Sequence, residues 1–278
     1  MSQPEVYMSA IKLRSLTIFV FATIAAACTD NSSAPSSSNS IDLPAILSEI
    51  SFASGLTIAG AGASPTTRLG TSISTRAPSS CGYTASVQGF VCPTVTSNGI
   101  TFDLTYYLYD AAGHALTSAD AAPIASVRTV SDLKGTATIP PTNGTSGTIA
   151  LTDHHDMTLT GLLGDKRTLN GTTSSHHDVS LSGATAFRAV IEGASVTHDV
   201  VLPKEGSSPP WPLSGTITSD FTTAVSHPSP AVTTSTHSVI TFTGSSMATV
   251  VSTTTTVAGT FTTTCTIDLS GAKPPVCS

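Results

Sequence analysis

The stretch Ile100-Thr101-Phe102-Asp103-Leu104-Thr105-Tyr106 decides the fold, because large apolar and polar residues alternate along it without a break. Successive side chains of a β-strand point to opposite faces, so this alternation predicts a strand with one buried and one wet face. The same pattern recurs at 157–160, 179–182, 239–242 and 261–269. The sequence therefore predicts an all-β protein, with a large curved antiparallel sheet or sandwich of about 9 to 13 strands.

Residue pairs that favour tight turns separate the predicted strands. They are Asn98-Gly99, Asn143-Gly144, Gly164-Asp165 and Asn170-Gly171, together with the segment 110–113. Asn and Gly tolerate the positive φ angles that short hairpin loops require. Proline pairs at 140–141, 209–210 and 274–275 predict loops, because proline has no backbone N–H to donate across a sheet.

Composition excludes several classes of protein. Only 10% of the 278 residues are charged, against roughly 25% in an ordinary soluble domain, and the net charge is −6. No basic run is present that could neutralise nucleic-acid phosphates, so we expect no nucleic-acid partner. A hydrophobic content of 39% also distinguishes the chain from charge-rich disordered proteins.

The first 28 residues carry an export signal. Lys12 and Arg14 precede the apolar run SLTIFVFATIAAA at 15–27, which is shorter than the roughly 20 residues that span a bilayer, and Cys28 follows it directly. Residues 8–28 resemble the signal of bacterial lipoproteins, with Ala25 at the position where a leucine is usual. The resemblance implies that residues 1–27 are a cleaved signal peptide and that Cys28 becomes a diacylated N-terminus. It also implies a lipid-anchored place in the bacterial cell envelope, and Thr29 favours the outer membrane.

Beyond the signal, the chain divides into a tether and one domain. Residues 28–41 are Ser-rich and polar, which predicts a disordered tether. Residues 42–278 are predicted to form a single mainly-β domain with one short helix over Asp42–Ser54, packed on an apolar face of the sheet. Asp42 can cap this helix, and its apolar stripe consists of Leu43, Ile46, Leu47, Ile50 and Phe52.

The other cysteines are an even set, as expected for disulfides in an exported chain: Cys81, Cys92, Cys265 and Cys277. Four cysteines allow three connectivities. Chain entropy favours the two local pairs, Cys81 with Cys92 and Cys265 with Cys277. A long-range pair that ties the start of the sheet to its last strand remains the alternative.

A histidine repeat is the strongest internal similarity. The sequence HHDMTLTG at 154–161 resembles HHDVSLSG at 176–183, and a weaker copy follows at 197–202. A long hairpin turned at 164–166 would place His154 opposite His176 and Asp153 opposite His177, whereas turns at each His-His-Asp would set the copies two strands apart. Imidazole and carboxylate groups are ligands of Zn²⁺, Ni²⁺ or Cu²⁺, so the candidate metal ligands are His154, His155, His176, His177, Asp156 and Asp178. The alternative is a solvated polar face without metal.

No catalytic motif stands out. The chain has no G-x-S-x-G, H-E-x-x-H, phosphate-binding or dinucleotide-binding motif, and an S-x-x-K spacing such as that at Ser131–Lys134 is expected by chance among so many serines. We therefore predict no enzyme and no cofactor, but a membrane-anchored envelope lipoprotein with a binding or scaffolding role. The alternatives are an envelope metal-binding protein that uses the histidine repeat, and a carrier of a hydrophobic ligand.

Overall fold

The computed structural model describes residues 81–278 except 143–144, 184–185, 205–206, 209, 227–230 and 271–274. Within these residues the regular elements are all strands, and the 13 strands form one antiparallel sheet, which confirms the all-β prediction. Cys28, the predicted signal peptide, the tether and the helix predicted over Asp42–Ser54 lie outside the described residues. No helix that could span a membrane occurs in the described part of the chain.

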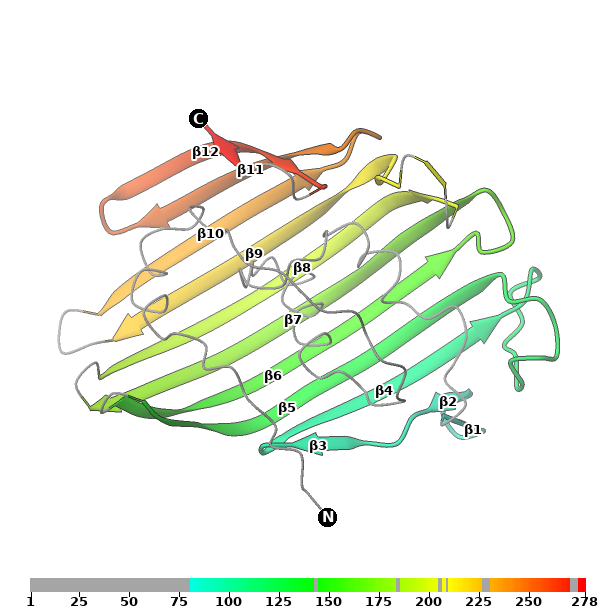
Figure 1. The fold of residues 1–278 in the computed structure, drawn as a ribbon, viewed down its shortest axis with the longest axis horizontal. Helices are drawn as coiled ribbons and strands as arrows, with labels where there is room; N and C mark the ends of the chain where they lie inside the picture. The colour runs from blue at the N-terminus through cyan, green and yellow to red at the C-terminus, as the bar shows by residue number, and fades with distance from the viewer. Residues whose placement is uncertain are drawn as a thin grey trace, which may run out of the picture.

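The strands lie across the sheet in nearly the order in which they occur in the chain (Figure 1). Only β3 lies off this path, paired with β4. The strands are β1 (Gly82–Thr84), β2 (Gly89–Val91), β3 (Val95–Ser97), β4 (Ile100–Tyr109), β5 (Ser126–Thr142), β6 (Thr145–Thr160), β7 (Lys166–Gly183), β8 (Phe187–Pro203), β9 (Ser214–Ser226), β10 (Val232–Thr241), β11 (Met247–Thr256), β12 (Gly259–Asp268) and β13 (Val276–Cys277).

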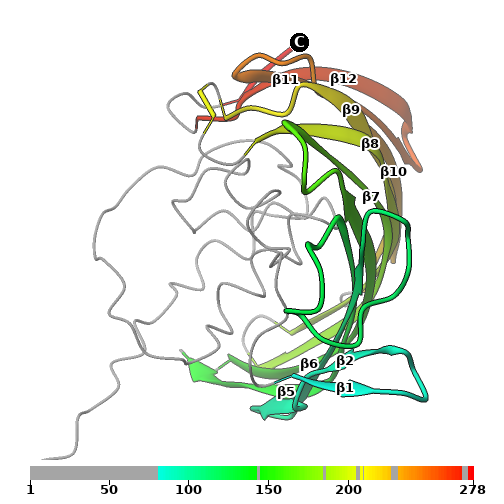
Figure 2. The ribbon, with the colours of Figure 1, turned by 90° about the vertical axis from the view of Figure 1, so that its right-hand side faces the viewer.

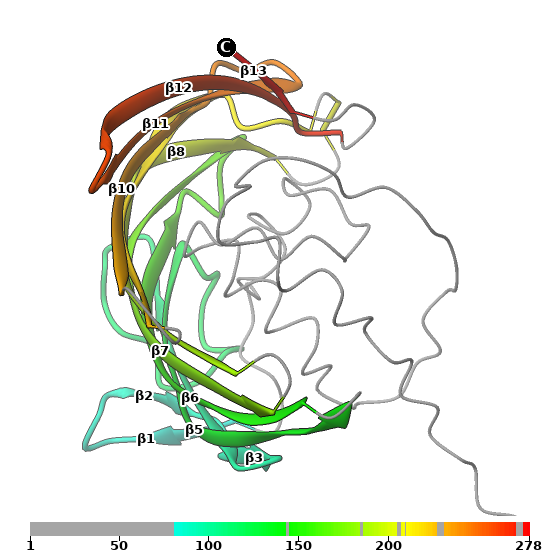
Figure 3. The same ribbon diagram turned by 90° about the vertical axis from the view of Figure 1, so that its left-hand side faces the viewer.

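The sheet bends into a trough, seen end-on in Figures 2 and 3. Its longest strands, β5 to β8, have 16 to 18 residues, three times the usual strand length of about 5 to 6. Long twisted strands cannot stay in one register along their whole length, so the pairing is interrupted by bulges. The register shifts between Ile139 and Thr142, between Leu169 and Gly171, and between His198 and Val201.

The two faces of the sheet differ in burial. Leu108, Val127, Leu159 and Leu169 occupy directly paired positions on β4 to β7 and are at most 1% exposed. We call the face that these side chains share the concave face, and the opposite face the convex face. At one end of the concave face, connecting segments supply further apolar side chains that pack on this row, namely Leu116, Ala122, Ile124, Leu162 and Trp211.

One predicted turn is confirmed, while another predicted turn and one predicted proline loop are wrong. Asn98-Gly99 joins β3 to β4 with φ angles of 50° and 79°, as predicted. The turn predicted at Asn170-Gly171 is wrong, because both residues lie inside β7, next to its register shift. The loop predicted at Pro140-Pro141 is also wrong, since both residues belong to β5 at a register shift. An interrupted ladder tolerates residues that cannot donate a backbone hydrogen bond.

Both disulfides predicted from local pairing are present, and they lie at opposite edges of the sheet. Cys81 bonds Cys92 beside β1 and β2. Cys265 bonds Cys277 at directly paired positions of β12 and β13. The short strands at both edges are therefore held covalently, whereas the long central strands are held by their backbone ladders.

Candidate functional site

The histidine repeat lies on two adjacent strands, β6 and β7, which form the long hairpin predicted as one of two alternatives. The register is two residues away from the predicted one: His154 is opposite Ser174, and His176 is opposite Thr152. The shift arises because the pairing nearest the turn joins Thr160 to Thr168, so the hairpin is centred on Gly164, one residue before the centre of the predicted turn, and one residue at the centre changes the register by two.

The two histidines of each copy point to opposite faces, because neighbouring residues of a strand alternate. His154 and His176 lie on the convex face, while His155 and His177 lie on the concave face. No group of three or more His, Cys, Asp or Glu side chains that could hold a metal ion occurs among the described residues. The six candidate ligands are thus not brought to one site.

Three histidines of the convex face pair with carboxylates across strands. Nδ1 of His154 lies 2.8 Å from Oδ1 of Asp132, and Nδ1 of His176 lies 3.0 Å from Oε1 of Glu192. His237 on β10 repeats the arrangement, with Nδ1 2.7 Å from Oδ1 of Asp220 on β9. These side chains are about half exposed, so the face presents an ordered array of polar groups to solvent.

The aspartates of the repeat bind arginines instead of a metal. The Arg128 guanidinium donates two hydrogen bonds to Asp156, from Nε at 2.7 Å and from the terminal nitrogen at 2.6 Å, and it lies 5.2 Å from the centre of the Tyr107 ring. Arg188 binds Asp178 in the same bidentate way. Each arginine lowers the pKa of its aspartate by hydrogen bonding to the carboxylate.

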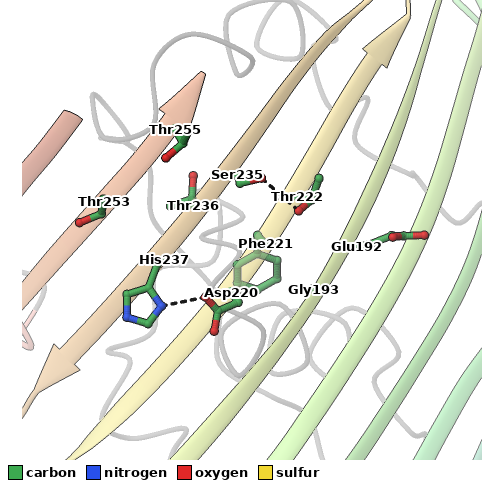
Figure 4. Close-up of a pocket in the computed structure, with 10 residues that line it drawn as sticks. All are labelled: Glu192, Gly193, Asp220, Phe221, Thr222, Ser235, Thr236, His237, Thr253 and Thr255. Carbon is green, nitrogen blue, oxygen red and sulfur yellow. Dashed lines mark hydrogen bonds and ion pairs between the residues drawn. The ribbon is translucent and has the colours of Figure 1, made fainter. Parts of the chain in front are cut away.

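A shallow depression of about 370 Å³ crosses β8 to β11 (Figure 4). His237 and Asp220 lie side by side in it, and Glu192 lies two strands from His237. The lining residues are Glu192, Gly193, Asp220, Phe221, Thr222, Ser235, Thr236, His237, Thr253 and Thr255. The Asp220, Thr222, Ser235 and His237 side chains belong to the convex face. The depression therefore offers hydroxyl and carboxylate groups, which suit a polar partner.

The concave face contains a polar row that the sequence did not reveal. Directly paired positions from β5 to β11 carry polar side chains, namely Ser131, His155, Thr173, Ser195, Ser219, Ser238 and Ser252. Hydroxyl groups hydrogen-bond along the row at 2.8 Å, between Thr173 and Ser195 and between Ser238 and Ser252. The row becomes visible only when the register of every strand pair is known, because each residue taken alone is one Ser or Thr among many.

Buried polar groups lie in and beside this row. Asp153 is 2% exposed, and its Oδ1 lies 2.8 Å from Nε2 of His177. His155 and Ser175 are each 7% exposed, and in the described part of the chain Nε2 of His155 and Oγ of Ser175 have no hydrogen-bond partner. Burial lowers the pKa of His155, against the opposing effect of the Asp153 charge, so its imidazole remains neutral.

Comparison of the chain with protein-family models, with curated proteins and with solved structures found no match.

Proposed function

We propose that the chain is a lipid-anchored protein of the bacterial cell envelope that binds a partner protein through its convex face, without catalysis. The observation that carries this proposal is the array of cross-strand pairs on that face, with the depression across β8 to β11 around its third pair, His237 and Asp220. An array spread over six strands suits a broad contact rather than the enclosure of a small molecule.

The chemistry of the depression indicates the kind of partner surface. Glu192 and Asp220 supply carboxylates, and Thr222, Ser235 and Thr253 supply hydroxyl groups. Carboxylates accept charge-assisted hydrogen bonds from lysine or arginine, so we expect a contact rich in basic and polar side chains. The carboxylates are held in place by His176 and His237 before binding, which reduces the side-chain entropy that binding would remove.

The anchoring part of the proposal rests on the sequence. Cys28 follows a signal that resembles those of lipoproteins, and the polar tether after it can extend up to about 40 Å. Two acyl chains give stable attachment, at about 0.8 kcal/mol for each buried CH₂ group. The tether would then limit how far from the membrane the sheet can meet its partner.

Apolar residues of the concave face favour one second candidate, a carrier of a hydrophobic ligand. Leu151, Ile191, Val179 and Ala189 lie on this face beyond the polar row, on β6 to β8. A carrier would use this surface to shield an acyl chain from water. It would retain a lipid-sized mass in native mass spectrometry of the protein purified from the periplasm as the Cys28→Ser variant.

Site-specific photo-crosslinking in living bacteria tests the proposed function. A photo-reactive phenylalanine analogue is placed at Thr253 in the depression, and at Thr148, a convex position on β6, as the control. We expect a crosslinked partner only from Thr253, and its loss in the Asp220→Lys variant. Equal capture from both positions, or capture that the charge reversal leaves unchanged, would contradict the proposal. Labelling with an alkynyl fatty acid, lost in Cys28→Ser, tests the anchor separately.

A further inference from the structure

We propose that the segment Asp42–Ser54 of the same chain docks on the concave face and covers it. This inference goes beyond the proposed function, because it concerns the face opposite to the one that binds the partner. It assigns a place in the molecule to the apolar stripe that the sequence predicts for this segment. It also means that the part of the chain between the tether and the sheet packs against the sheet.

The middle of the concave face is buried without a described element above it. Leu133 is 1% exposed, Asp153 2%, and Ser195 and Ser219 are each 3% exposed. The extensive contacts between described elements all join neighbouring strands of the one sheet. Connecting segments cover only the apolar row at one end, and Leu133 packs in a separate cluster made solely of β4, β5 and β6 residues. A sheet face without a second layer would leave such side chains open to water.

The composition of the chain before the described residues favours this segment as the occupant of the concave face. Residues 29–40 are polar and Ser-rich and cannot bury apolar surface. Residues 42–54, by contrast, contain Leu43, Ile46, Leu47 and Ile50 at helical spacing and only two charged side chains. An amphipathic helix of this kind requires an apolar surface, and the concave face is the extended buried face that the described sheet offers.

The chain between this segment and the sheet is long enough for the segment to reach the concave face. Residues 55–80 join the segment to Cys81 beside β1, at one edge of the sheet, and can extend up to about 85 Å. The longest strand, β7, has 18 residues and measures about 60 Å. The segment can therefore reach any row of the concave face, including the Nε2 of His155 and the Oγ of Ser175, which need polar partners.

Neighbouring residues on two strands provide a matched test on the full mature chain with Cys28→Ser. Thr223 on β9 and Thr234 on β10 are directly paired on the concave face, and the adjacent Thr222 and Ser235 are directly paired on the convex face. A photo-reactive phenylalanine analogue is placed at each position in turn. After irradiation and trypsin digestion, the segment lies in the peptide that ends at Arg68, and fragmentation of the crosslinked peptide by mass spectrometry locates the crosslinked residue within it. We expect the concave positions to capture residues 42–54, and the convex positions not to.

A substitution inside the segment provides the second measurement. Ile46→Asp places a charge in the apolar stripe, and we expect at least a tenfold loss of the crosslink from Thr223, with increased binding of a hydrophobic dye. Ser48→Asp, outside the stripe, should leave both unchanged. Far-ultraviolet circular dichroism verifies that the sheet remains folded.

Three outcomes would overturn the proposal: no crosslink from the concave positions, capture of a different part of the chain or of a second copy, or equal capture from both faces. Each of these leaves the convex partner test unaffected, so a failure of the docking proposal can be distinguished from a failure of the proposed function.

Discussion

The concave and convex faces of this sheet are built from the same strands, and both contain histidine–carboxylate pairs, yet these pairs differ in burial. On the convex face, His154 and Asp132 form a pair that is about half exposed. On the concave face, the neighbouring Asp153 and His177 form a pair of the same chemistry with Asp153 only 2% exposed. A one-residue step along β6 thus separates a solvated pair from a buried one, which shows that burial, rather than residue type, decides the energetic weight of each group.

The largest difference in stability is expected when two adjacent residues, one on each face, are truncated to alanine. Leu133→Ala removes a side chain that is 1% exposed, so it should reduce the free energy of unfolding by about 2 to 5 kcal/mol. Lys134→Ala, next to it on the convex face, removes a side chain that is 60% exposed and should change stability by less than about 0.5 kcal/mol. Chemical denaturation of both variants measures the contrast. Equal effects would show that the two faces are not buried differently.

Gly193 packs closely against the ring of Phe221. A Cβ atom at Gly193 would lie 2.0 Å from Cδ1 of Phe221, so the ring covers this glycine on the concave side. Gly193→Ala should therefore destabilise the protein by about 1 to 3 kcal/mol. Ala194→Ser, at the adjacent exposed position, should be nearly neutral.

A double-mutant cycle verifies that the Phe221 ring causes this cost. In the Phe221→Ala background, the added Cβ meets no ring, so Gly193→Ala should have a much smaller effect there. An unchanged effect would mean that the cost arises in the backbone and that the ring contact is unimportant.

Because His155 is buried, we expect the stability of the protein to depend on pH through this residue of the concave face. Burial lowers its pKa in the folded state below the value of about 6.5 in an unfolded chain. As the pH falls through about 6.5, the unfolded chain binds a proton that the folded chain does not, so stability decreases. His155→Leu should remove this part of the acid sensitivity, as measured by urea unfolding at pH 7 and pH 5. His154→Gln, on the convex face, should retain it; retention in His155→Leu would contradict the assignment.

The smallest effect is expected for an ion pair of the convex face. Arg128 is 40% exposed, and surface pairs of this kind contribute between about 0 and 1 kcal/mol. Arg128→Met should therefore have a small effect that decreases further in 1 M salt, because exposed charges are screened. Thermal unfolding at low and high salt measures it. A loss of several kcal/mol would show that the pair is part of the buried structure.

Several features of the fold were predictable because they depend on local patterns. Strict alternation over Ile100–Tyr106 predicted β4, and its even-numbered residues are indeed the buried side. Chain entropy predicted the local disulfides, and Asn98-Gly99 has the backbone angles of the predicted turn.

Features that depend on pairing between strands were not predictable. Asn170-Gly171 has the sequence of a turn but lies inside β7, which β6 and β8 hold on both sides. A two-residue change in register decides that His154 faces Ser174 instead of His176, and it follows from a hairpin centre that lies one residue earlier than predicted. The polar row through His155 and Ser195 requires the register of every strand pair at once. Candidate site residues were therefore identified by type, but not by the face they occupy.

The difference between the two faces can be measured most directly by cysteine labelling along one strand. Single cysteines replace residues 217–222 of β9 in turn, and the rate of reaction with a maleimide is measured in the folded protein. Residues 217, 219 and 221 belong to the concave face, and 218, 220 and 222 to the convex face. The account predicts slow labelling at the odd positions and fast labelling at the even ones. Rates without this alternation would contradict the central claim that one face of the sheet is covered and the other is open.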